Sequence, residues 1–213
     1  MPDTHSTLRA EHLADRAVLT FGLILSMIGF GWLLALMSTH MDASRGWSCG
    51  VYGTALVLMY SCATVYHWLP DERPRSLMRI LDHCAIFVLI AGTYTPFTLP
   101  NIAAPWAKST LLLMWTMVAV GIVYKFIWIG RRDRFAVFLY LAMGWSAIAV
   151  FQPLSEIIPA PVFRLIIAGG VLYSLGAIVY VWKGLPFRLP IWHLFVIAAS
   201  SVHYAAVATY LVS

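Results

Sequence analysis

Seven apolar stretches occupy most of this chain, and each is long enough to cross a lipid bilayer. A helix rises about 1.5 Å per residue, so roughly 20 residues span the hydrocarbon core. The stretches cover residues 17–37, 47–68, 79–99, 107–128, 135–153, 161–182 and 190–211. Backbone polar groups inside a bilayer must be paired within the protein, which helices achieve along their own length. The sequence therefore predicts an all-α integral membrane protein, with a seven-transmembrane-helix bundle at residues 17–213 after an N-terminal segment at residues 1–16.

The composition supports this fold class. The chain has 213 residues, of which 61% are hydrophobic and only 11% are charged, whereas a soluble domain carries roughly 25% charged residues. The formal net charge of +5 does not indicate nucleic acid, because the basic residues fall in short connections between apolar stretches. Cys49, Cys62 and Cys84 form no CxxC pair and are predicted to be buried small residues rather than disulfide partners. We therefore expect membrane lipids as partners, while the oligomeric state stays open.

The distribution of lysine and arginine predicts the orientation of the helices. The N-terminal segment and every second connection hold eleven of the fourteen: Arg9, Arg16, Arg73, Arg75, Arg79, Lys125, Arg131, Arg132, Arg134, Lys183 and Arg188. The opposite side holds the other three, Arg45, Lys108 and Arg164. Because basic residues concentrate in cytoplasmic connections, the N-terminus is predicted to be cytoplasmic and the C-terminus external.

Three ionisable residues lie inside the apolar stretches at one common depth. His67, Asp82 and His193 each lie about one helical turn from the predicted cytoplasmic boundary, on three different helices. Such residues are costly in hydrocarbon and mark functional sites, and imidazole and carboxylate are ligands that zinc accepts. The sequence thus predicts a metal site formed by these three residues. Depth alone does not fix the rotation of each helix, so two alternatives stay open: internally hydrogen-bonded histidines, and an Asp82 paired with Arg79 or His83.

His203 is predicted to have a different role. It lies ten residues beyond His193, which places it about 15 Å deeper and rotated by about 80° on the same helix. It therefore cannot share a metal ion with His193 along an unbroken helix. We expect a structural histidine with Ser200, Ser201 or Tyr204 as nearby hydrogen-bond partners.

Three sequence blocks resemble the hemolysin III family, the bacterial branch of the progestin and adipoQ receptor superfamily. They are Ala-Thr-Val-Tyr-His at 63–67, Leu-Asp-His-Cys-Ala-Ile-Phe at 81–87 continuing into Ala-Gly-Thr-Tyr-Thr-Pro-Phe at 91–97, and Ile-Trp-His-Leu-Phe-Val at 191–196. The resemblance extends over nearly the whole chain. It implies seven helices with a cytoplasmic N-terminus in a bacterial inner membrane, and a zinc ion near the cytoplasmic face.

The resemblance also implies roles for individual residues. His67 matches the zinc ligand of the second helix, His193 matches the second of two ligands on the seventh, and Asp82 matches an aspartate close to the zinc-bound water. Two positions depart from the pattern, because Ala63 replaces a serine and Leu189 replaces the first histidine of the seventh helix. Losing an imidazole should weaken zinc binding unless Asp82 becomes a direct ligand. Direct ligation would in turn compromise Asp82 as a general base.

Three functions are compatible with these features. The leading hypothesis is a zinc-dependent hydrolase of a lipid amide or ester, such as a ceramide-like molecule, in which His67 and His193 hold the metal and Asp82 is catalytic. The alternative is a non-enzymatic membrane-homeostasis or sensor protein whose polar cluster is structural, which the missing serine and histidine favour. A cytolytic pore ranks third, because no apolar stretch carries a polar stripe suited to lining an aqueous channel.

Overall fold

The computed structural model describes residues 4–39, 43–127 and 133–213, and the elements within these ranges are all helical. The long helices are α1 (Thr4–Thr39), α2 (Ala43–Trp68), α3 (Glu72–Thr98), α4 (Pro105–Ile127), α5 (Asp133–Trp145), α7 (Ala160–Val181) and α8 (Arg188–Val212). Shorter segments are the 3-10 helices η1 (Leu99–Asn101) and η2 (Ser146–Val150) and the seven-residue helix α6 (Phe151–Ile157). The predicted all-α class is confirmed.

The described residues contain seven helical segments that are long and apolar enough to cross a membrane. They are Leu8–Ser38, Ala43–Trp68, Glu72–Asn101, Pro105–Ile127, Phe135–Ile157, Ala160–Val181 and Arg188–Val212. The fifth combines α5, η2 and α6, so its backbone tightens to 3-10 geometry halfway along. The first helix runs without a break across residue 16, and the chain is helical well before the apolar stretch begins.

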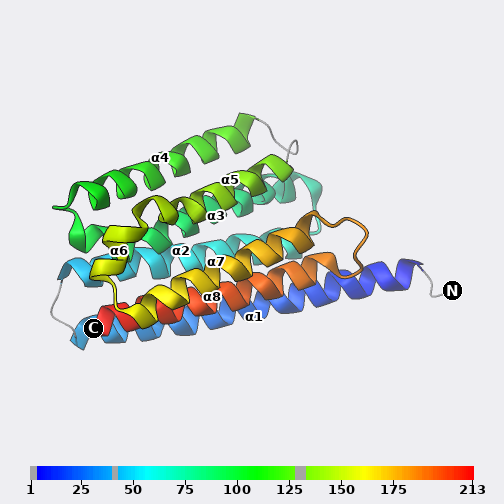
Figure 1. Cartoon of the computed structure of the whole chain (residues 1–213). Helices are drawn as coiled ribbons and strands as arrows, with labels where there is room; N and C mark the ends of the chain where they lie inside the picture. Colours follow the sequence, from blue (N-terminus) through cyan, green and yellow to red (C-terminus); the bar gives the residue numbers. More distant parts are fainter. Residues whose placement is uncertain (1–3, 40–42, 128–132) are drawn as a thin grey trace.

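The helices lie roughly side by side along one common direction (Figure 1). α2 and α3 pack against each other, α1 packs against α2 and α8, α7 packs against α8, and α4 packs against α3. The connections place the start of α1, the end of α2, the start of α3, the end of α7 and the start of α8 at one end of the bundle (Figure 1). We call this end, where the label N lies, the N-terminal end of the bundle.

The buried face of α1 is narrow and contains small and polar residues. Its most buried positions recur at spacings of four, three, four and seven residues: Asp15, Leu19, Gly22, Ser26 and Leu33. Large apolar side chains such as Phe21, Ile28 and Trp32 are exposed on the other faces. An exposed apolar surface of this kind suits contact with lipid. The spacing places Asp15 on the face that α1 turns toward its neighbours.

Close approach of α3 to α2 depends on Gly92. A Cβ atom added at this position would lie 2.8 Å from the Cβ of Ala55 and 3.7 Å from the Cα of Tyr52. By contrast, a Cβ atom added at Gly31 on α1 would meet nothing within 4 Å. Small residues at helix–helix contacts let backbones approach closely in membrane proteins. Elsewhere in the core, Cys49, Cys62 and Cys84 are free and buried, as predicted.

We predict that Gly92→Ala destabilises the protein and that Gly31→Ala does not. Overpacking a close contact costs about 1–3 kcal/mol, whereas alanine in an open helical position gains up to about 1 kcal/mol over glycine. Thermal unfolding of the purified protein in detergent, followed by circular dichroism, measures both changes. Equal midpoints for the two variants would show that the α2–α3 contact is not as tight as described.

Candidate functional site

Two of the predicted site residues meet at an aspartate of α1. His67, from the last turn of α2, places its Nδ1 atom 2.5 Å from Oδ2 of Asp15. His193, near the start of α8, places its Nδ1 atom 2.6 Å from Oδ1 of the same carboxylate. The two imidazole ring centroids are 5.3 Å apart, and their planes are nearly perpendicular. Asp15 is only 2% exposed, so one buried carboxylate joins two helix ends from different parts of the sequence.

Neighbouring contacts of α1 fix the positions of these helix ends. The Nε atom of Arg16 donates a hydrogen bond to the backbone carbonyl of His67 at 2.9 Å, and its guanidinium lies over the Trp68 ring. On the other side, Oε1 of Glu11 accepts a hydrogen bond from the backbone N–H of Phe187 at 2.7 Å. Phe187 precedes α8 and has a left-handed backbone with φ of 54°. Residues 11–16 of α1 therefore hold both the end of α2 and the start of α8.

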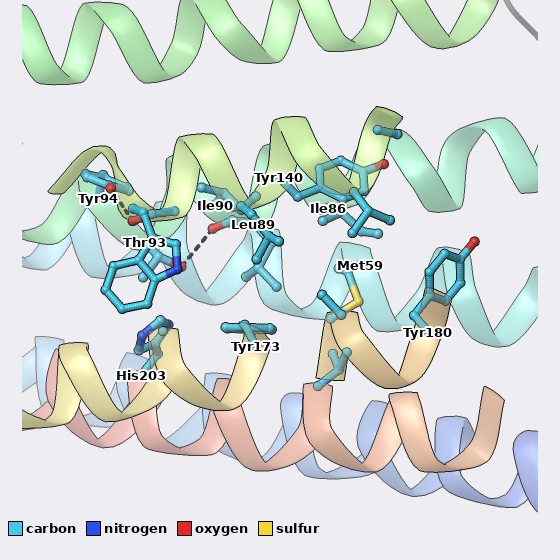
Figure 2. A pocket seen from close by; sticks show the side chains of 18 of the residues that line it. Met59, Ile86, Leu89, Ile90, Thr93, Tyr94, Tyr140, Tyr173, Tyr180 and His203 are labelled. Atoms are coloured by element: carbon cyan, nitrogen blue, oxygen red, sulfur yellow. Dashed lines mark hydrogen bonds between the residues drawn. The ribbon is translucent and has the colours of Figure 1, made fainter. Parts of the chain in front are cut away.

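A cavity of about 700 Å³ extends from these histidines into the bundle. Figure 2 shows its middle and far parts, where Met59, Ile86 and Leu89 face the ring of Tyr173 across the space, with His203 beyond it. Most of the lining side chains are apolar or aromatic. The near end is polar and is lined by His67, Asp82 and His193 with the basic residues Arg79, Lys125, Lys183 and Arg188. The cavity thus has the polarity of an amphiphile, with one polar end and one long apolar part.

Asp82 lines this cavity but makes no hydrogen bond or ion pair to His67 or His193. Among residues 4–39, 43–127 and 133–213, no group of three or more His, Cys, Asp and Glu side chains is arranged to hold a metal ion. The ligand chemistry of zinc is nevertheless present, because two imidazoles and one carboxylate border the same space. The structure thus brings two of the three predicted residues into contact through Asp15, while Asp82 lines the same cavity without a hydrogen bond or ion pair to either of them.

His203 lies deeper in the cavity and is held by α7. Its Nε2 atom donates a hydrogen bond to the backbone carbonyl of Ile166 at 3.0 Å. Gly169 makes room for the ring, since a Cβ atom there would lie 2.2 Å from His203 Cδ2. The predicted structural role agrees with this contact, but the predicted partners do not. Ser200 Oγ pairs with the Tyr60 hydroxyl, and the Tyr204 hydroxyl donates to the backbone carbonyl of Gly29.

Asp15 is the site residue that the apolar pattern does not reveal. It precedes the first apolar stretch and stands in a mixed-charge segment beside Arg16, so hydropathy assigns it to a tail outside the bundle. The signal is in the spacing of α1. Asp15 continues, by one more step of four, the run of buried positions that begins at Leu19. Extending that face toward the N-terminus would have predicted a buried carboxylate.

Comparison with known proteins gives consistent matches along the chain. The family described as Haemolysin-III related matches residues 19–204. "Hemolysin-3" of Bacillus cereus is 38% identical over 200 residues, covering 94% of this chain and 91% of that protein. "Hemolysin-3 homolog" of Bacillus subtilis (strain 168) is 34% identical over 202 residues, covering 95% of each. The human "Monocyte to macrophage differentiation factor" is 28% identical over 209 residues, covering 94% of this chain and 84% of that protein.

Proposed function

Because the chain belongs to the Haemolysin-III related family, we propose that it binds zinc and hydrolyses an ester or amide bond of a membrane lipid. The protein would lie in a bacterial inner membrane with the N-terminal end of its bundle at the cytoplasmic face. One observation carries the proposal: two imidazoles meet at the polar end of a largely apolar cavity of about 700 Å³. A site of this size and polarity suits a substrate with an apolar chain and a polar linkage.

The histidines suit zinc in their orientation as well as in their chemistry. Each Nδ1 atom is turned to Asp15, and neither Nε2 atom has a hydrogen-bond partner among the described residues. Histidines that ligate a metal usually donate their other ring N–H to a carboxylate. His67 and His193 would hold the ion through Nε2, and Asp82 would reach it through a water molecule. A bound zinc ion supplies a water nucleophile at neutral pH and polarises a carbonyl group.

The remaining steps belong to residues of the chain. Asp82 would accept a hydrogen bond from the attacking water, take its proton as general base, and return that proton to the leaving nitrogen or oxygen as the C–N or C–O bond breaks. The basic residues at the polar end, Arg79, Lys125, Lys183 and Arg188, favour a substrate with electronegative atoms beside the scissile bond. Apolar side chains along the cavity hold an acyl chain and exclude bulk water. The substrate enters from the bilayer, because its apolar part is already dissolved there.

The two departures from the family pattern lie at this site. Ala63 and Leu189 both line the large cavity, and Leu189 is one helical turn before His193 on α8. A histidine at position 189 would add a third imidazole to the polar end. Its absence leaves zinc with fewer protein ligands, which weakens binding without removing the two imidazoles that already meet.

We predict that His67→Ala and His193→Ala each weaken zinc binding by at least about tenfold, equivalent to about 1.4 kcal/mol, because each removes an imidazole ligand. Leu189→His should strengthen it by restoring the third imidazole. Zinc content by plasma emission spectroscopy and competition with a chelator measure both changes on purified protein. His12→Ala, an exposed histidine of α1, is the matched control. Unchanged zinc in the His67 and His193 variants would remove the proposed metal site.

Asp82→Asn tests the hydrolysis. Loss of a general base lowers the rate by about 10²–10⁴-fold, so turnover of a fluorogenic ceramide-like amide in lipid nanodiscs should nearly vanish. Asp71→Asn, at the exposed start of α3, should keep wild-type turnover. No turnover by the zinc-loaded wild type across amide and ester lipids, or full turnover by Asp82→Asn, contradicts the proposed reaction.

The second candidate function is a non-enzymatic membrane protein in which the cluster only fastens helices. The contact of Asp15 with both imidazoles favours it, because it already pairs the Nδ1 atoms without a metal. This candidate requires that substituting Asp15, His67 or His193 lowers the thermal midpoint, and that the wild-type protein takes up no zinc. The zinc measurement above therefore separates the two candidates.

A further inference from the structure

We propose that Asp15 is a positioning residue that sets the tautomer and the direction of both His67 and His193, so that their Nε2 atoms face the large cavity as a pair. The inference rests on the proposed zinc site, and it assigns a function to α1, the helix in which the sequence predicts no site residue. It also explains why a carboxylate is kept at a buried position in a membrane-length helix, where an unpaired charge is costly.

The carboxylate of Asp15 is shared between two imidazoles. Oδ1 accepts a hydrogen bond from Nδ1 of His193 at 2.6 Å, and Oδ2 lies 2.5 Å from Nδ1 of His67 in a close polar contact that is not aligned as a hydrogen bond. An ionised carboxylate can only accept hydrogen bonds. Two lone pairs cannot face each other at such short distances, so each Nδ1 atom carries a proton, and in a neutral imidazole the lone pair then lies on Nε2. One aspartate thus prepares two metal-ligating nitrogens at once.

The carboxylate of Asp15 and the two imidazoles lie against different cavities. His67 and His193 line the large cavity, whereas Asp15 does not. Asp15 lines a separate cavity of about 370 Å³ between α1 and the α7–α8 connection, together with Glu11 and Leu185. The imidazoles consequently stand between the carboxylate and the large cavity. With Nδ1 turned to Asp15, the opposite edge of each ring, which carries Nε2, is turned away from it toward the large cavity.

The part of α1 that carries Asp15 is rigidly held. Asp15 is 2% exposed, and hydrogen bonds from the next residue and from the residue one turn earlier on α1 anchor both partners. Arg16 bonds the backbone of His67, and Glu11 bonds the backbone of Phe187 at the start of α8. The carboxylate of Asp15 therefore stays in place even if one of the imidazoles rotates away from it. In metal sites, losing such a carboxylate partner typically costs 10–100-fold in affinity, although it touches no metal.

The test compares Asp15→Asn with Glu11→Gln, which makes the same change of acid to amide one turn earlier on α1. In Asp15→Asn, the amide oxygen can accept a hydrogen bond from one Nδ1–H. The amide NH₂ group faces the other imidazole and can donate only to an Nδ1 that carries no proton. At least one histidine should therefore switch to the Nε2–H tautomer. Glu11→Gln keeps an oxygen for the Phe187 N–H and should leave both histidines unchanged.

Two measurements on the full-length protein in nanodiscs decide the outcome. Imidazole ¹⁵N NMR of metal-free protein, at a pH where the rings are neutral, should show Nδ1–H in His67 and His193 of wild type and a switched tautomer in Asp15→Asn. Chelator competition should show zinc affinity lowered about 10–100-fold in Asp15→Asn and unchanged in Glu11→Gln. Nε2–H tautomers in the wild type overturn the inference, and this result needs no folded variant.

The outcomes separate this inference from the proposed function. If the wild type binds zinc and Asp15→Asn binds it with equal affinity, the role of Asp15 is overturned and the metal site stands. If the wild type shows the expected tautomers but takes up no zinc, the positioning role of Asp15 is supported and the zinc proposal is overturned. If zinc affinity falls as far in Glu11→Gln as in Asp15→Asn, the loss reflects the stability of α1 in general, and the specific role of Asp15 is overturned.

Discussion

The contact of one buried carboxylate with two imidazoles joins the parts of this bundle that are farthest apart in sequence. Asp15 lies 178 residues before His193, yet Oδ1 of the aspartate is 2.6 Å from Nδ1 of the histidine. The other oxygen meets His67, so α1, α2 and α8 share one polar contact at the N-terminal end of the bundle. Buried charges are stable only when their partners and geometry compensate for desolvation. The alignment of the three helix ends and the chemistry of the cavity both depend on this contact.

Most of the fold follows from the sequence, because length and hydropathy act on each helix separately. Seven apolar stretches become seven membrane-length helical segments, and polar residues extend α1 and α3 beyond the predicted apolar boundary. The change to 3-10 geometry at Ser146–Val150 has no hydropathy signature. The family assignment likewise rests on local motifs that the chain retains, and the match over residues 19–204 confirms it.

The candidate site is less predictable, because it depends on how each helix is rotated about its axis. Depth placed His67, Asp82 and His193 in one layer, and the two histidines do meet, but through a residue that hydropathy assigns to the tail. Asp15 becomes visible only when the spacing of buried positions along α1 is continued toward the N-terminus. Similarly, His203 lies in the cavity as a structural histidine, while its partner, the carbonyl of Ile166, belongs to a different helix that no local pattern specifies.

An experimentally determined structure of the zinc-soaked protein, with anomalous diffraction recorded on both sides of the zinc absorption edge, tests the central claim most directly. The account predicts one anomalous peak at bonding distance from Nε2 of His67 and of His193, about 2.0–2.1 Å, with both Nδ1 atoms still turned to Asp15. A map without a peak at this end of the cavity contradicts the claim. So does a peak bonded to Nδ1, with the imidazoles turned away from the aspartate.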